Sequence, residues 1–242
     1  MTSLVLAIAT FVSTLLGGLV ALHRRHQLHL ITVFAAGVLI AAALLDLLPD
    51  AFHQVEQTGE SSIENVLLGA ALGFLAFYAL DRFVHSSAAM HTPRPGKAAF
   101  GTVASLGLTI HSFLDGFAIG SSFRIDATIG LLVATAVIAH DFGDGISTVG
   151  IVLGSRGGIR ESLGWLVADA VAPVLGAGIA LMIAISSGML ANLLGFFAGS
   201  FLFIGGAHLL PESSHEDKGV QVPATFLSGF VFIFVVTHLL AH

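Results

Sequence analysis

Eight long apolar runs divide this chain of 242 residues, and short polar segments separate them. A helix needs about 20 apolar residues to cross a bilayer, and the runs lack the alternating pattern of a transmembrane barrel. Hydrophobic residues make up 55% of the chain and charged residues 10%, which leaves no room for a separate soluble domain. We therefore predict an all-α membrane protein with a single polytopic domain over residues 1–242. The predicted spans are residues 2–22, 29–50, 63–81, 98–122, 127–153, 162–186, 189–211 and 222–241.

The basic residues predict how the chain is oriented. Loops that face the cytoplasm carry an excess of Lys and Arg. With eight spans, eight of the nine basic residues fall on one side of the membrane, and only Arg124 falls on the other. This split places both termini outside, in a plasma or inner membrane of the cell. The basic residues on the inner side are Arg24, Arg25, Arg82, Arg94, Lys97, Arg156, Arg160 and Lys218.

Acidic and histidine side chains lie deep within these apolar spans, where no Lys or Arg accompanies them. An ionised side chain at the bilayer centre costs roughly 3 kcal/mol even on lenient insertion scales. The carboxyl groups must therefore be protonated, hydrated in a cavity or neutralised by a cation. Histidine favours a metal cation, because neutral imidazole is the commonest metal ligand. The residues concerned are Asp46, Asp115, Asp141, Asp144, Asp169, His111, His140 and His208.

A His-x-x-x-Asp motif occurs in both the fourth and the fifth predicted span. Positions i and i+4 share one face of a helix, so His111 and Asp115 point the same way, as do His140 and Asp144. Two facing helices would then present two nitrogen and two oxygen ligands, a set suited to a first-row divalent ion. Asp141 points about 100° away from its neighbour. It is therefore predicted to join an adjacent second site.

A five-residue pattern occurs twice, 162 residues apart. Asp-Leu-Leu-Pro-Asp occupies residues 46–50, and His-Leu-Leu-Pro-Glu occupies residues 208–212. In the predicted topology the second span runs outward and the seventh inward, which inverts the two copies. We predict a 3 + 2 + 3 inverted-repeat bundle, as in many secondary transporters, with a proline break at each helix end as the alternative. The predicted outer pathway is Asp46, Asp50 and His53, and the predicted inner pathway is His208, Glu212 and His215.

Glycines are frequent in the spans, and they favour the close approach of neighbouring helices. The glycines predicted to do so are Gly116, Gly120, Gly145, Gly150, Gly154, Gly176, Gly178, Gly205 and Gly206.

With these motifs, HSFLDG and HDFGDG, the chain resembles a divergent, prokaryotic-type member of the ZIP (Zrt/Irt-like) family of divalent metal transporters. The likeness covers the whole length. It implies a 3 + 2 + 3 helix bundle, a homodimer in the lipid bilayer, and uptake of Zn²⁺, Fe²⁺, Mn²⁺ or a related ion such as Cd²⁺ or Co²⁺. Where the family motifs carry glutamate, this chain has aspartate. Where they carry proline, it has Leu114 and Gly143.

The resemblance also implies a role for individual residues. By position, His111, Asp115, His140 and Asp144 match the main transport site of the family, and Ser112 and Asp141 match positions that contribute to a second ion site in some members. The sixth span of the family often supplies a glutamate just before a proline. Here the acid is Asp169, about one turn before Pro173.

These observations predict a transporter of divalent transition metals, not an enzyme, that moves the ion toward the cytoplasm by alternating access. The metal is then the transported substrate, and neither a catalytic cofactor nor a nucleic acid is expected. No nucleotide-binding loop of the Walker type occurs in the sequence, which argues against ATP drive within this chain. The alternative is an intramembrane zinc-dependent hydrolase with an open metal position for water. An inverted repeat favours transport, because it serves access from both sides.

Overall fold

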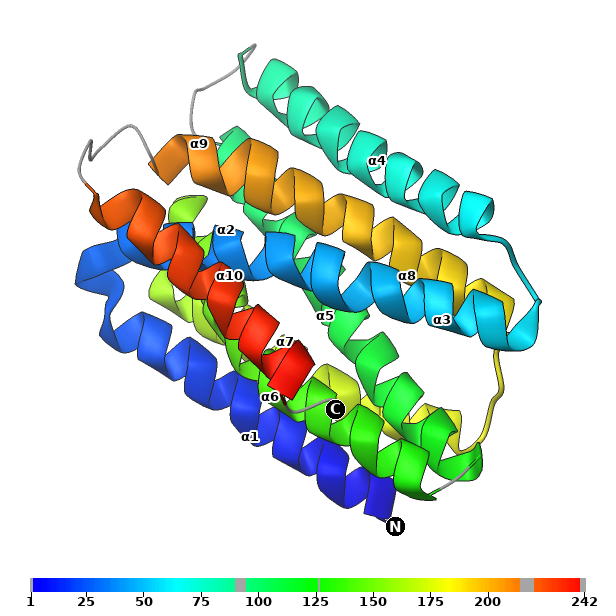
Figure 1. Cartoon of the computed structure of the whole chain (residues 1–242). Helices are drawn as coiled ribbons and strands as arrows, with labels where there is room; N and C mark the ends of the chain where they lie inside the picture. Colours follow the sequence, from blue (N-terminus) through cyan, green and yellow to red (C-terminus); the bar gives the residue numbers. More distant parts are fainter. Residues whose placement is uncertain (1, 90–94, 126, 214–219, 240–242) are drawn as a thin grey trace.

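The computed structural model describes residues 2–89, 95–125, 127–213 and 220–239, and all of the regular secondary structure in these ranges is helical (Figure 1). Within these ranges, eight helical segments are long and apolar enough to cross a membrane. This confirms the predicted all-α architecture and the number of spans. The helices are α1 (Thr2–His23), α2 (Leu28–Ala42), α3 (Leu48–Thr58), α4 (Ile63–Ala89), α5 (Pro95–Ile125), α6 (Ala127–Gly154), α7 (Ile159–Ala180), α8 (Ser187–Leu202), α9 (Leu210–Ser213) and α10 (Gln221–Leu239), with the short segments η1 (Arg25–Gln27), η2 (Ala43–Leu47) and η3 (Phe203–Leu209).

Several predicted span boundaries differ from the observed helix ends. The third span, predicted to stop at residue 81, continues as α4 to Ala89. The second crossing continues past residue 50 to Thr58, where Gly59 ends it in a left-handed conformation with a φ of 65°. The sixth ends at Ala180 and not at residue 186, and the Ala180 carbonyl accepts a hydrogen bond of 2.9 Å from Nη1 of Arg124. Hydropathy locates the membrane-embedded part of a helix. Capping contacts decide where the helix stops.

Four pairs of helices form the bundle. α1 packs along α6, α5 along α7, α4 along α8, and α10 along α2, with α4 at the edge of the bundle (Figure 1). In each pair, a glycine of one helix lies against the backbone of the other, so closely that an added Cβ would overlap it. The paired glycines are Gly17 and Gly145, Gly116 and Gly176, Gly73 and Gly199, and Gly37 and Gly229.

These contacts test the glycine prediction. They confirm the predicted close packing for Gly116, Gly145 and Gly176. The prediction for Gly178 is wrong, because a Cβ at that position would have no neighbour within 4 Å.

Two π-helical turns interrupt the second and seventh crossings, just before their prolines. In η2 the Leu48 N–H donates to the Ala43 carbonyl, and in η3 the Leu210 N–H donates to the Gly205 carbonyl. The two hydrogen bonds are 162 residues apart, like the sequence patterns that they precede. A proline has no N–H to donate, and its ring clashes with the carbonyl four residues back. The wider turn accommodates this without ending the helix. Residues 46–50 therefore lie within a continuous crossing.

Candidate metal centre

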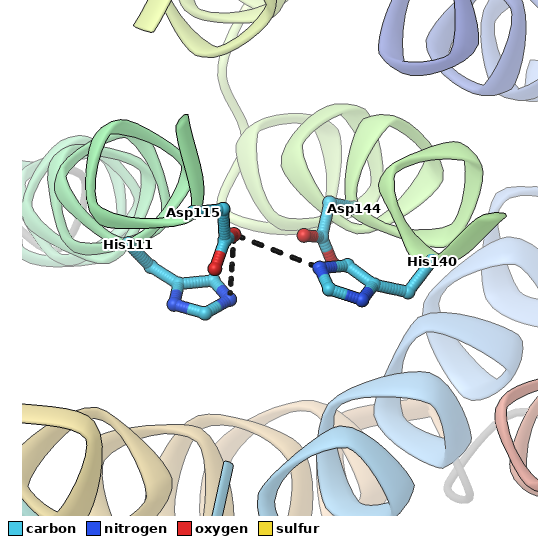
Figure 2. Close-up of side chains that lie close together, drawn as sticks. All are labelled: His111, Asp115, His140 and Asp144. Carbon is cyan, nitrogen blue, oxygen red and sulfur yellow. Dashed lines mark ion pairs between the residues drawn. The ribbon is translucent and has the colours of Figure 1, made fainter. Parts of the chain in front are cut away.

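Helices α5 and α6 bring the two His-x-x-x-Asp motifs face to face. His111, Asp115, His140 and Asp144 point toward one another between these helices (Figure 2). Each side chain offers one ligand atom such that all four atoms lie within 4.8 Å of one another. Nε2 of His111 is 3.2 Å from Oδ2 of Asp115, and Nε2 of His140 is 3.6 Å from the same oxygen. The set comprises two imidazoles and two carboxylates, as its spacing predicts.

The cluster is buried, and its polar atoms lack hydrogen bonds. The four residues are 1%, 6%, 5% and 2% exposed in chain order. Among the described residues, no hydrogen-bond partner faces His111 Nδ1, Asp115 Oδ2, either nitrogen of His140 or Asp144 Oδ2. Leaving such atoms unpaired costs free energy, and a bound cation would satisfy several of them at once. Two nitrogen and two carboxylate ligands suit a first-row divalent ion.

Two further carboxylates contact His140. Oδ2 of Asp46 lies 3.3 Å from Nδ1 of His140, and Oδ1 of Asp141 lies 3.7 Å from its Nε2. The other oxygen of Asp141 faces the Thr14 hydroxyl of α1 at 3.4 Å. Asp46 was predicted to lie along the outer approach. In the structure it reaches the cluster itself, from η2 of the second crossing.

The other two predicted metal ligands bind each other. Ser112 Oγ donates to Oδ1 of Asp169, and Thr148 Oγ1 donates to Oδ2, both at 2.8 Å. Asp169 is fully buried, and these bonds connect α7 to both α5 and α6. Thr148 was missed by the sequence reasoning, because a hydroxyl within an apolar helix is no metal-site signal.

A cavity of about 490 Å³ leads to the cluster from one end of the bundle. Its lining extends from His53 and Asp50 on α3, past Asp46, to Asp115 and His140. This brings the three residues of the predicted outer pathway into one cavity with two residues of the cluster. On the other side of the cluster the helices close together: Phe100, Leu108 and Phe201 are at most 1% exposed. The Phe201 ring lies edge-on to His111, with ring centroids 5.0 Å apart.

The predicted inner pathway is described only in part. Nδ1 of His208 lies 3.3 Å from Oδ1 of Asp81, and its ring lies 3.9 Å from the Phe100 ring between centroids. Asp81 was missed because it stands at the end of the third predicted span, beside a basic loop. Glu212 belongs to α9, but its side chain lies outside the described part of the structure, as does all of His215.

Eight apolar helices around a buried His–Asp cluster define a polytopic membrane protein with a candidate site for a divalent cation. The chain belongs to the ZIP zinc transporter family, which matches residues 2–105 and 96–237. This agrees with the resemblance of the two motifs.

Curated relatives support the same assignment. The chain is 30% identical over 196 residues to zinc transporter ZIP13 of Pongo abelii. This match covers 76% of this chain and 58% of the relative. It is 26% identical to zinc transporter YKE4 of Saccharomyces cerevisiae (86% and 68% covered) and 25% identical to zinc transporter ZIP9-A of Xenopus laevis (86% and 83% covered). The chain thus spans less than two thirds of the ZIP13 relative. All three are named as transporters and not as enzymes.

Proposed function

We propose that this protein carries a divalent transition-metal ion across the cell membrane toward the cytoplasm, and that His111, Asp115, His140 and Asp144 hold the ion on the way. The observation that carries the proposal is the meeting of these four side chains, with ligand atoms within 4.8 Å, at the end of a cavity open to one side. Burial limits the access of competing water to the ligands. The hydrophobic surroundings strengthen their attraction for a cation.

Zinc is the first candidate for the cargo. The relatives are named as zinc transporters, and a four-ligand set of imidazole and carboxylate groups suits tetrahedral Zn²⁺. Fe²⁺, Mn²⁺, Co²⁺ and Cd²⁺ are the competitors, because carboxylates also accept harder ions. Asp141 lies near enough to His140 to complete a larger coordination shell for such ions. The bonds of Ser112 to Asp169 support a role for this pair in holding α5 against α7.

Alternating access is the transport mode that we propose. The ion enters past His53, Asp50 and Asp46 and leaves past His208, Glu212 and His215. The two π turns support an inverted 3 + 2 + 3 repeat, because their hydrogen bonds keep the 162-residue offset of the sequence patterns. The helix pairs support it too: exchanging the halves converts α1–α6 into α7–α5, and α4–α8 into α10–α2. Such symmetry makes an inward-open state the counterpart of an outward-open one.

The same topology predicts how the protein lies in the membrane. Both termini lie outside in our proposal, because eight of nine basic residues then face the cytoplasm. The exposed faces of α1 and α4 carry large apolar side chains such as Val5, Leu16, Leu68 and Leu75. These faces contact lipid, and in the homodimer implied by the family likeness one such face meets a second copy.

Proteoliposomes test the proposal. Purified protein is reconstituted, and uptake of Zn²⁺ is followed with a trapped fluorescent indicator, with the other four ions as competitors. Wild type is expected to show saturable uptake. His111→Ala and Asp144→Ala are expected to reduce it to the background of empty liposomes, whereas His23→Ala, at the exposed end of α1, leaves it unchanged.

The outcomes separate the two functions. Unchanged flux in both ligand variants would overturn the site. Wild-type protein that binds zinc and cleaves lipid amides or peptides but moves no ion would favour the intramembrane hydrolase.

A further inference from the structure

The ring of His140 lies between carboxylates on both of its nitrogens. Oδ2 of Asp115 is 3.6 Å from Nε2, inside the His–Asp cluster, and Oδ2 of Asp46 is 3.3 Å from Nδ1, on the opposite edge of the ring. The side chains of His140 and Asp46 are 6% and 13% exposed, and both line the cavity that leads to the cluster. The two atoms, Oδ2 of Asp46 and Nδ1 of His140, are close enough for an ion pair, but they do not form a hydrogen bond in the structure.

A neutral imidazole carries one proton, on one of its two nitrogens. A nitrogen can bind a metal only through a free lone pair. If Nε2 faces the ion, the proton must therefore reside on Nδ1, where Asp46 can accept it. Ligating histidines commonly donate their other N–H to a carboxylate, which orients the ring and raises the basicity of the ligand.

The backbone also explains how Asp46 reaches this place. Asp46 stands in the π turn η2, not on either helix that carries the cluster. Consecutive helical residues point about 100° apart, so without the extra residue of the turn Asp46 would point elsewhere relative to the start of α2. The neighbouring acid Asp50 lines the same cavity.

We propose that Asp46 is a positioning residue that holds His140 in the tautomer with a free Nε2, and so sets the affinity of the cluster for its ion. This inference rests on the transport site proposed above and adds a residue from a third helix to it. Asp46 acts through His140 and does not itself bind the ion.

Zinc affinity measures the effect. Each protein is prepared in lipid nanodiscs and titrated with Zn²⁺ against a chelator of known affinity. Asp46→Leu is expected to weaken zinc binding by about 10- to 100-fold, the range for losing the carboxylate partner of a ligating histidine. Asp46→Asn keeps an oxygen that accepts from Nδ1–H, and it is expected to weaken binding less than Asp46→Leu. Glu56→Gln removes a charge from the exposed side of the same crossing and serves as the matched control.

A spectroscopic measurement separates positioning from a structural role. The protein is labelled with ¹⁵N in its histidine rings, and the His140 signals are assigned by their loss in His140→Gln. Zinc-bound wild type is expected to carry its ring proton on Nδ1 of His140. In Asp46→Leu, this proton is expected to exchange faster with solvent, while thermal unfolding shows an intact fold.

Two results would overturn the inference: wild-type zinc affinity in Asp46→Leu, or a zinc-bound wild type with the His140 proton on Nε2. The transport proposal fails separately. If wild type shows no flux but its zinc affinity still depends on Asp46, the positioning role stands and the transport function falls. If wild type transports zinc and Asp46→Leu binds zinc with wild-type affinity, the transport function stands and the positioning role falls.

Discussion

Buried carboxylates in this bundle fall into two groups. Asp169 accepts a hydroxyl hydrogen bond on each oxygen, so its polar atoms are satisfied within the protein. Asp115 and Asp144 each have a buried oxygen without a hydrogen-bond partner among the described residues. The first arrangement is complete without an ion, and the second calls for one. This difference favours one ion per chain at the cluster, with Asp169 as a connection between helices.

Replacing Asp169 tests this distinction. Asp169→Leu removes both acceptors and leaves the Ser112 and Thr148 hydroxyls to find other partners. We expect the free energy of unfolding to fall by about 1–3 kcal/mol, the usual cost of unsatisfied buried polar groups. The number of zinc ions bound per chain is expected to stay at one, as measured by calorimetry in detergent. Two ions in wild type and one in the variant would instead make Asp169 a metal ligand.

The four residues of the cluster were predictable from the sequence, but the side chains that contact them were not. His111 and Asp115 stand four residues apart on one helix, so local geometry places them together. The contact between Asp46 and His140 joins two crossings and depends on a π turn, which no residue pattern announces. Thr148 and Asp81 escaped notice for a related reason. Their importance comes from the side chains opposite them, which only the tertiary structure reveals.

Close helix crossings depend on single glycines. A Cβ at Gly116 would overlap the Pro173 backbone, which cannot move without separating α5 from α7. We expect Gly116→Leu to lower the free energy of unfolding by about 1–3 kcal/mol or more, as overpacking does elsewhere, and to displace one half of the cluster. Thermal unfolding and zinc affinity measure the two effects.

Gly178→Leu is the matched control, because a Cβ there meets open space. It is expected to leave both quantities near their wild-type values. Equal losses in both variants would mean that the crossing itself is not the cause.

The number of helices was predictable from hydropathy, but several helix ends were not. The second crossing extends to Thr58 because helix α3 leaves the apolar stretch and continues into polar residues. The end of α7 involves Arg124, a residue 56 positions earlier in the chain. Which helices pack together was likewise beyond the sequence: glycines marked close approaches, but the partner of each glycine lies on another helix.

The cavity opens the described part of the bundle toward one end. The chain has no cysteine, so single cysteines can be labelled without background. On α6, Ala136 lines the cavity, whereas Ala134 is fully buried. We expect a charged, membrane-impermeant thiol reagent added outside the cell to label Ala136→Cys rapidly and Ala134→Cys hardly at all. Labelling of Ala136→Cys only from the cytoplasmic side would reverse the proposed orientation.

We expect the affinity of the protein for its metal ion to fall as the pH is lowered. Two imidazoles and two carboxylates must be free of protons to bind an ion, so binding releases protons and acid opposes it. With one proton displaced per ion, the affinity for zinc falls by about tenfold for each pH unit below the titration of the ligands. Zinc titrations at pH 7.5 and pH 5.5 measure this, with the His23→Ala protein as a control that retains the dependence. An affinity independent of pH would contradict the ligand set.

The two π turns also bear on the history of the chain. A π turn holds one residue more than the α turn that it replaces, which is the geometry that inserting a single residue into a helix would produce. Here the two turns stand 162 residues apart, each just before a Leu-Pro step. If the halves descend from one duplicated gene, as the proposed repeat implies, the insertion is older than the duplication. Both halves then inherited the insertion. The matching position of the two patterns is now Asp46 in one half and His208 in the other.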